Sequence, residues 1–188
     1  MAPDPAAVEA APPDTKPDKE KDPVASLCGQ VPLLPTGDRA ALRRLYLTRS
    51  EMAAGIVTGL LLRAGVPHAD ALRPATFARW QLLAHVAAVL SGTAAVPPHH
   101  PGAGLGRALH EADYSDHRLM RLTSARGPAL VDQIVRAARV LASAGKVPVN
   151  FHTLRDLSLD TALVAEAARL RIARDYYATK HASTKDAS

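Results

Sequence analysis

Cysteine and aromatic residues are scarce in this chain. One cysteine, Cys28, among 188 residues excludes an internal disulfide framework and an all-cysteine zinc site within one chain. Aromatic residues make up 4%, and β-branched residues are too thinly spread to predict a sheet. Ala, Leu and Arg dominate instead, which favours helices packed through small and aliphatic side chains. The composition therefore predicts an all-α protein.

Targeting and membrane-spanning segments are also missing. The first residues, MAPDPAAVEAAPPDTKPDKEKDPVAS, lack the basic start and the apolar run of a secretory signal. The most apolar stretch, LLAHVAAVLSGTAAV, is too short to span a bilayer and contains His85. We therefore expect a cytoplasmic protein with no membrane partner.

The motifs of common catalytic and cofactor sites do not occur. There is no P-loop and no Gly-x-Ser-x-Gly, and GAGLGR at residues 102–107 lacks the third glycine and the preceding strand of a dinucleotide fingerprint. The eight histidines show neither His-x3-His nor di-iron Glu-x-x-His spacing. We expect solvated loop side chains at His99 and His100, and a core or helix-surface role for His85. No catalytic residue, metal or cofactor is predicted, although metal analysis would test the alternative of a helical histidine–carboxylate enzyme.

Charge is distributed unevenly along the chain. Residues 1–36 hold three Lys against six Asp or Glu, a net charge of −3, whereas residues 37–188 hold 20 Lys or Arg against 12 Asp or Glu, a net charge of +8. Most of this positive charge is arginine, whose planar guanidinium matches phosphate oxygens. The balance favours a nucleic-acid or other polyanionic partner. A solvated arginine-rich surface without a partner is the alternative.

Proline, glycine and apolar periodicity divide the chain. The first segment has no apolar period and cannot bury enough surface to offset its ordering entropy, and a proline-rich stretch later interrupts the helical pattern. We predict about eight or nine helices in two small bundles. The predicted divisions are a disordered acidic, Pro/Ala-rich tail at 1–36, an N-terminal helical lobe at 37–92, a Pro-rich loop at 93–101, a C-terminal helical lobe at 102–179 and a frayed tail at 180–188.

Helix boundaries follow from capping residues. We expect N-caps at Asp38, Ser115 and Asn150, and a helix that has Pro74 in its first turn and ends at Gly92. The clearest helix starts at Gly127-Pro128. One of its sides is apolar, with Leu130, Ile134, Ala137 and Leu141, and the other is polar, with Asp132, Arg136, Arg139 and Ser143. The spacing of Asp132 and Arg136 predicts an ion pair.

Arginines gather on the predicted helix surfaces. Each alone is explained as a solvated or locally paired side chain, but their density predicts phosphate contact. The candidate residues are Arg43, Arg44, Arg107, Arg118, Arg121, Arg126, Arg136 and Arg139. Base stacking is not expected, because Phe77, Trp80 and Phe151 lie in apolar helical settings. A stand-alone helix-turn-helix regulator, with VDQIVRAARVL as its recognition helix, is the alternative.

Four short blocks resemble one known family. They are GDRAALRR at 37–44, GAGLGRALHEA at 102–112, RLMRLTSARG at 118–127 and ARDYY at 173–177. Their order and spacing, over Gly37 to Thr179, are similar to the CasB family, the small subunit of the type I-E CRISPR surveillance complex, Cascade. By this resemblance Arg107 matches the Gly-Arg-Ala-Leu block, Arg43 and Arg44 the basic end of the first helix, and Arg118, Arg121 and Arg126 a basic helix and its exit turn.

The resemblance also implies a fold and a function. It implies an all-helical, non-catalytic protein of two small bundles, present as two copies beside the backbone and large subunits of Cascade. Such a protein contacts the backbones of the guide RNA (crRNA) and of the target DNA, and helps to hold the R-loop open until a separate nuclease-helicase arrives. Exchange of a DNA duplex for an RNA–DNA heteroduplex is nearly balanced in free energy, so modest backbone contacts decide whether the opened state persists.

Overall fold

The computed structural model describes residues 22–48, 51–67, 73–92, 97–159 and 162–186. Within these ranges the chain forms nine α-helices, one 3-10 helix and no strand, which confirms the all-α prediction. None of the helices described is long and apolar enough to cross a bilayer. The N-terminal elements are α1 (Pro23–Gln30), η1 (Val31–Leu33), α2 (Thr36–Thr48), α3 (Glu51–Arg63) and α5 (Pro74–Leu90). The C-terminal elements are α6 (Leu105–Glu111), α7 (Asp116–Ser124), α8 (Gly127–Ser143), α9 (Phe151–Leu157) and α10 (Ala162–Asp186).

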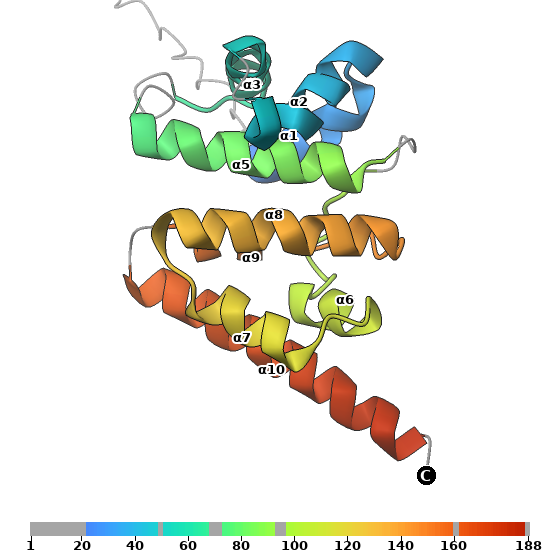
Figure 1. Ribbon diagram of the computed structural model, residues 1–188. Helices are drawn as coiled ribbons and strands as arrows, with labels where there is room; N and C mark the ends of the chain where they lie inside the picture. The colour runs from blue at the N-terminus through green and yellow to red at the C-terminus, as the bar shows by residue number, and fades with distance from the viewer. Residues whose placement is uncertain (1–21, 49–50, 68–72, 93–96, 160–161, 187–188) are drawn as a thin grey trace, which may run out of the picture.

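The helices are arranged around a central pair, α5 and α8. In Figure 1, α1, α2 and α3 lie on one side of α5, while α6, α7 and α10 lie beyond α8. α9 packs on α10 and also contacts α5 and α1. Buried side chains from both groups form one continuous hydrophobic cluster. The two predicted lobes therefore share a core, and the packing of α5 on α8 joins them.

The predicted disordered tail extends too far along the chain. Residues 23–33 form α1 and η1, so the prediction of disorder is wrong there. Leu27 and Cys28 of α1 are fully buried, and Asp22 caps the helix because its Oδ1 accepts from the Val24 N–H at 3.0 Å. Pro23 at the first helical position is compatible with this start. The rest of the predicted tail, residues 1–21, lies outside the described residues.

The opposite end of the chain is also more helical than predicted. α10 continues to Asp186, and the Thr184 hydroxyl donates to the Lys180 carbonyl at 2.9 Å. The predicted frayed tail is therefore wrong over residues 180–186, while residues 187–188 lie outside the described part. A helix of this length is stabilised mainly by the packing of one face, because isolated helices are marginal in water.

Most of the predicted helix boundaries are confirmed. The side chains of Ser115 and Asn150 cap α7 and α9, and Pro74 is the first residue of α5. Gly92, which follows the C-cap of α5, has a φ of 51°, a conformation that suits glycine. Asp38 is wrong as an N-cap, since α2 begins at Thr36. It lies instead in the first turn, where a carboxylate still favours the helix dipole.

The segment between α5 and α6 is attached to the segment that precedes α9. The Val149 N–H donates to the Pro98 carbonyl at 2.9 Å, and the Val149 carbonyl accepts from the His100 N–H at 3.1 Å. The Asn150 side chain donates to the Pro101 carbonyl at 2.7 Å. Residues 97–101 of the predicted Pro-rich loop therefore form a fixed junction between the two halves. The rest of that loop, residues 93–96, lies outside the described residues.

Gly106 sets the distance between α6 and α10. A Cβ built at this position would lie 2.0 Å from the Ile172 carbonyl oxygen and 2.7 Å from the Tyr176 nitrogen, which are both backbone atoms of α10. Only glycine allows this approach without moving a helix. The Leu-Gly-Arg-Ala-Leu block therefore has a packing role, and within it the side chain of Arg107 is exposed.

Candidate nucleic-acid interface

Three of the predicted arginines lie in one neighbourhood on α7 and α8. α7 buries Leu119 and Leu122, so Arg118 and Arg121 face solvent, and Arg136 lies on the exposed side of α8. Burial raises the pKa of the Tyr114 phenol, and the positive charges of all three arginines oppose this rise. α7 packs on α8, so these three exposed arginines lie on neighbouring helices around the buried Tyr114.

Arg139 extends this basic surface toward α5. It is exposed one turn beyond Arg136, and its charge acts on the imidazole of His85 in α5. The apolar side of α8 is buried as predicted, through Leu130, Ile134, Ala137 and Leu141. We name the surface formed by Arg118, Arg121, Arg136 and Arg139 the α7–α8 arginine face.

The guanidinium groups of the α7–α8 arginine face are not engaged by the rest of the described chain. Among the residues that the structure describes, none of the four arginines forms an ion pair or donates a side-chain hydrogen bond. The predicted ion pair between Asp132 and Arg136 does not form. Because water covers these groups in the free protein, they can exchange it for phosphate oxygens without breaking contacts within the chain.

Two other predicted arginines have structural roles. Arg43 donates through Nε to the Ala88 carbonyl at 2.9 Å and through its terminal nitrogen to the Gly92 carbonyl, which fastens α2 to the end of α5. Arg126 donates to three carbonyls at the end of α7 and pairs with Glu166 of α10 at 3.0 Å. Their donors satisfy carbonyls that a helix end leaves without partners, so we leave both out of the interface.

The last two predicted arginines lie apart from the face. Arg107 is exposed and lines a cleft between α6 and α10 together with Glu111 and Asp175. These carboxylates weaken the attraction of the cleft for an anion. Arg44 is exposed on α2, on the other side of α5 from α7. Of the eight predicted arginines, four therefore lie on the α7–α8 arginine face, and the other four lie elsewhere.

His85 and Cys28 lie in the core. His85 is fully buried, its Nδ1 lies 2.8 Å from the Leu42 carbonyl oxygen, and its ring meets Tyr46 edge to face at 5.0 Å between centroids. Of the two predicted roles for His85, core or helix surface, the core role is confirmed. Burial, together with the charge of Asp22, raises the pKa of the Cys28 thiol. A thiol held protonated in apolar surroundings is a poor nucleophile.

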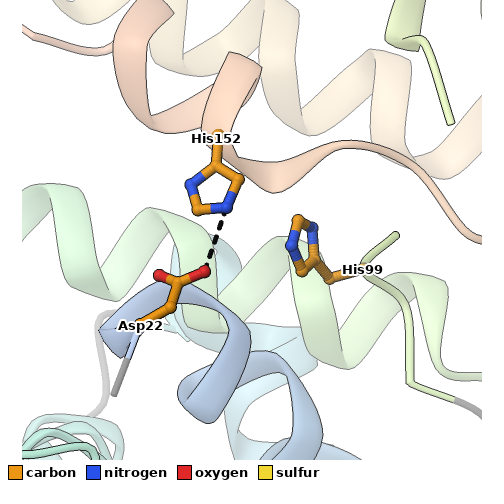
Figure 2. A group of neighbouring side chains, drawn as sticks. All are labelled: Asp22, His99 and His152. Carbon is orange, nitrogen blue, oxygen red and sulfur yellow. Dashed lines mark ion pairs between the residues drawn. The ribbon is translucent and has the colours of Figure 1, made fainter. Parts of the chain in front are cut away.

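Sequence reasoning missed one cluster of polar side chains. Asp22, His99 and His152 each offer one potential ligand atom, and these atoms lie within 4.8 Å of one another (Figure 2). The prediction of a solvated loop is wrong for His99, which is half-buried and accepts the Phe151 N–H on Nδ1 at 3.1 Å. Burial and the neighbouring His152 lower the pKa of His99, against the opposing effect of Asp22. No spacing along the chain indicates this cluster, because its members come from three distant segments.

A comparison with protein-family models identifies the chain. The model of the CRISPR-associated protein Cse2 matches residues 38–177. The chain belongs to the Cse2 family. No curated protein and no solved structure matches it significantly.

Cse2, also called CasB, is the small, non-catalytic subunit of type I-E Cascade. The resemblance predicted from four sequence blocks is therefore confirmed. The matched range of this Cse2 chain includes the whole α7–α8 arginine face and excludes α1.

Proposed function

We propose that this Cse2 chain binds the sugar-phosphate backbones of the guide RNA and the target DNA through the α7–α8 arginine face. As a cytoplasmic subunit of Cascade, it prolongs the life of the R-loop. One observation carries the proposal: four exposed arginines without partners in the described chain project from two helices whose other sides are buried in the core.

The chemistry of this face suits a backbone rather than a base sequence. Guanidinium groups on packed helices have fixed positions, so little order is lost when they meet phosphates. Each phosphate that is neutralised releases condensed counterions, which gives an affinity that depends on salt and not on sequence. Because strand exchange in an R-loop is nearly balanced, a few such contacts shift the equilibrium toward the open state.

An apolar row on α10 supports a protein partner as well. Leu163, Leu170 and Tyr177 follow one another at intervals of seven residues, so they lie on one side of the helix. Their exposed fractions are 87%, 67% and 36%. Exposed apolar side chains in a row mark a surface that another protein covers. We assign this surface to the backbone or large subunits of Cascade, or to a second copy of the chain.

The experiment removes two charges from the face. The double variant Arg121→Gln/Arg136→Gln is assembled into Cascade with guide RNA, and target binding and R-loop lifetime are measured between low and physiological salt. We expect weaker binding, shorter R-loops and a slope of log affinity against log salt that is smaller by about two, one for each phosphate that the variant no longer neutralises.

A matched double variant controls for net charge. Arg63→Gln/Arg73→Gln removes two exposed arginines at the end of α3 and just before α5, away from both the α7–α8 arginine face and the apolar row on α10. Circular dichroism checks that both proteins remain helical. If the two double variants lower the salt slope equally, net charge alone is responsible and the α7–α8 arginine face is not the interface. A footprint on one duplex without guide RNA would instead favour a helix-turn-helix regulator.

A further inference from the structure

Asp22, His99 and His152 meet at the junction of the two halves. Asp22 precedes α1, His99 lies between α5 and α6, and His152 lies in the first turn of α9. The Asp22 Oδ2 and the His152 Nε2 are 3.0 Å apart. The two imidazole rings meet edge to face, with centroids 4.9 Å apart. Figure 2 shows the ring of His99 beside this pair, so that three possible ligand atoms surround one small space.

Other hydrogen bonds hold the Asp22 side chain and the backbone of His152 in place. Asp22 uses Oδ1 to cap α1, which leaves Oδ2 directed toward His152. The backbone of His152 is fixed by its N–H, which donates to the Asn150 side chain at 2.9 Å. Metal ligands in proteins are oriented by such outer hydrogen bonds. The Asp22 carboxylate is therefore directed into the space by a contact that a bound ion would not disturb, and the backbone position of His152 is fixed by another.

The imidazole of His99 has one nitrogen without a partner. Its Nδ1 accepts from the Phe151 N–H at 3.1 Å, and the Val149 carbonyl lies near enough to accept a ring N–H instead. Its Nε2 is buried and has no hydrogen-bond partner in the part of the chain that the structure describes. A buried polar atom without a partner is costly. An Nδ1 that accepts the Phe151 N–H leaves the ring proton on Nε2. Cation binding at Nε2 therefore requires this proton to move to Nδ1, which then donates to the Val149 carbonyl and gives up the hydrogen bond from Phe151.

We propose that Asp22, His99 and His152 form a binding site for a zinc ion. Two imidazole nitrogens and one carboxylate oxygen are typical zinc ligands, whereas calcium and magnesium prefer oxygen alone. With bonds of about 2.0–2.1 Å, tetrahedral ligand atoms lie about 3.3 Å apart, so the Asp22–His152 pair already has nearly the required spacing. A shift of the His99 ring toward the other two ligands would close the site and leave the fourth position for water. The ion would fasten the start of α1 to α9 and to the segment before α6.

The test is a titration of the metal-free, full-length chain with Zn²⁺ alone. We expect one ion per chain, and an affinity at least tenfold lower in each of His99→Ala and His152→Ala. His100→Ala is the matched control, because His100 adjoins the cluster in sequence but is exposed and bonded to the Gly102 N–H. Saturating Zn²⁺ should raise the Tm of the wild type and of His100→Ala by about 5 °C, but not the Tm of the other two variants.

Two further measurements keep the proposal falsifiable if the alanine variants fold poorly. Asp22→Asn keeps an oxygen that can cap α1 but removes the charge, so it should bind zinc more weakly without loss of helix content. Co²⁺ in the wild-type chain should give the visible spectrum of a tetrahedral site. Absent or octahedral Co²⁺, or zinc binding that His99→Ala and His152→Ala leave unchanged, would overturn the assignment. None of these outcomes bears on the α7–α8 arginine face.

Discussion

His85 shows how one buried side chain is held in a single protonation state. Its Nδ1–H donates to the Leu42 carbonyl, and its Nε2 is buried without a hydrogen-bond partner in the described residues. A second proton would therefore place a charged N–H among apolar side chains and near Arg139. Burial lowers the pKa of His85 most, the Leu42 hydrogen bond opposes this effect, and the charge of Arg139 lowers the pKa further. The neutral form is the one that fits the fold.

This lowered pKa predicts how stability depends on pH. Histidine in an unfolded chain titrates near pH 6.5, so below that pH the unfolded state binds a proton that folded His85 does not. The free energy of unfolding should therefore decrease as the pH is lowered below about 6.5. For this one group the decrease is at most about 1.4 kcal/mol per pH unit. Urea unfolding between pH 5 and 7.5 should show a weaker decline in His85→Leu than in the wild type. The exposed His181→Gln should decline like the wild type, and equal slopes for His85→Leu and the wild type would contradict the assignment.

The predicted arginines show what residue type alone can and cannot indicate. Arginine on a helix surface predicts an available guanidinium, and this holds for Arg121 and Arg136. It fails for Arg43, because the carbonyls that its side chain contacts belong to residues 45 and 49 positions later. Sequence spacing predicts contacts within a helix, but it does not show which distant helix end a long side chain reaches.

At the scale of elements, the crossing of α6 and α10 explains the most specific block of the sequence. Gly106 lets the backbone of α6 approach that of α10, and Tyr176 of α10 donates its hydroxyl to the Tyr114 carbonyl just beyond α6. Asp116, in the first turn of α7, accepts from the same hydroxyl at 3.0 Å and from Lys180 at 2.7 Å. α10 thereby fixes α6 and the start of α7, the helix that carries Arg118 and Arg121.

Replacement of Gly106 by alanine should disturb this crossing. The added methyl group would overlap backbone atoms of α10 that cannot rotate away, so we expect a loss of about 1–3 kcal/mol in the free energy of unfolding, as for other overpacked sites. Gly55→Ala in α3 is the matched control. Its Cβ would meet no atom within 4 Å, and alanine should stabilise a helix interior by about 0.5–1 kcal/mol. Denaturant unfolding measures both, and a neutral Gly106→Ala would show that α6 and α10 do not approach as described.

At the scale of the whole molecule, α1 and the Asp22 cluster are the parts that sequence reasoning missed. Proline and acidic residues before residue 23 obscured a short helix that is stable only because Leu27 and Cys28 enter a core built by later helices. By contrast, the periodic apolar side chains of α8 and the N-caps of α7 and α9 depend on residues close together in the sequence, so they were predictable. The zinc ligands were not, since only the packing of three segments brings Asp22, His99 and His152 together.

The continuous core makes a last prediction about cooperativity. Leu27 is fully buried in α1, so Leu27→Ala should lower the free energy of unfolding by about 2–5 kcal/mol. Leu33→Ala is the matched control, because Leu33 is 77% exposed and its truncation should cost less than about 0.5 kcal/mol. Circular dichroism, which reports on all helices, and fluorescence of Trp80 in α5 should shift together in Leu27→Ala with an unchanged m-value. If the Trp80 transition stays at the wild-type midpoint, α1 unfolds separately from α5 and the core is not one cooperative unit.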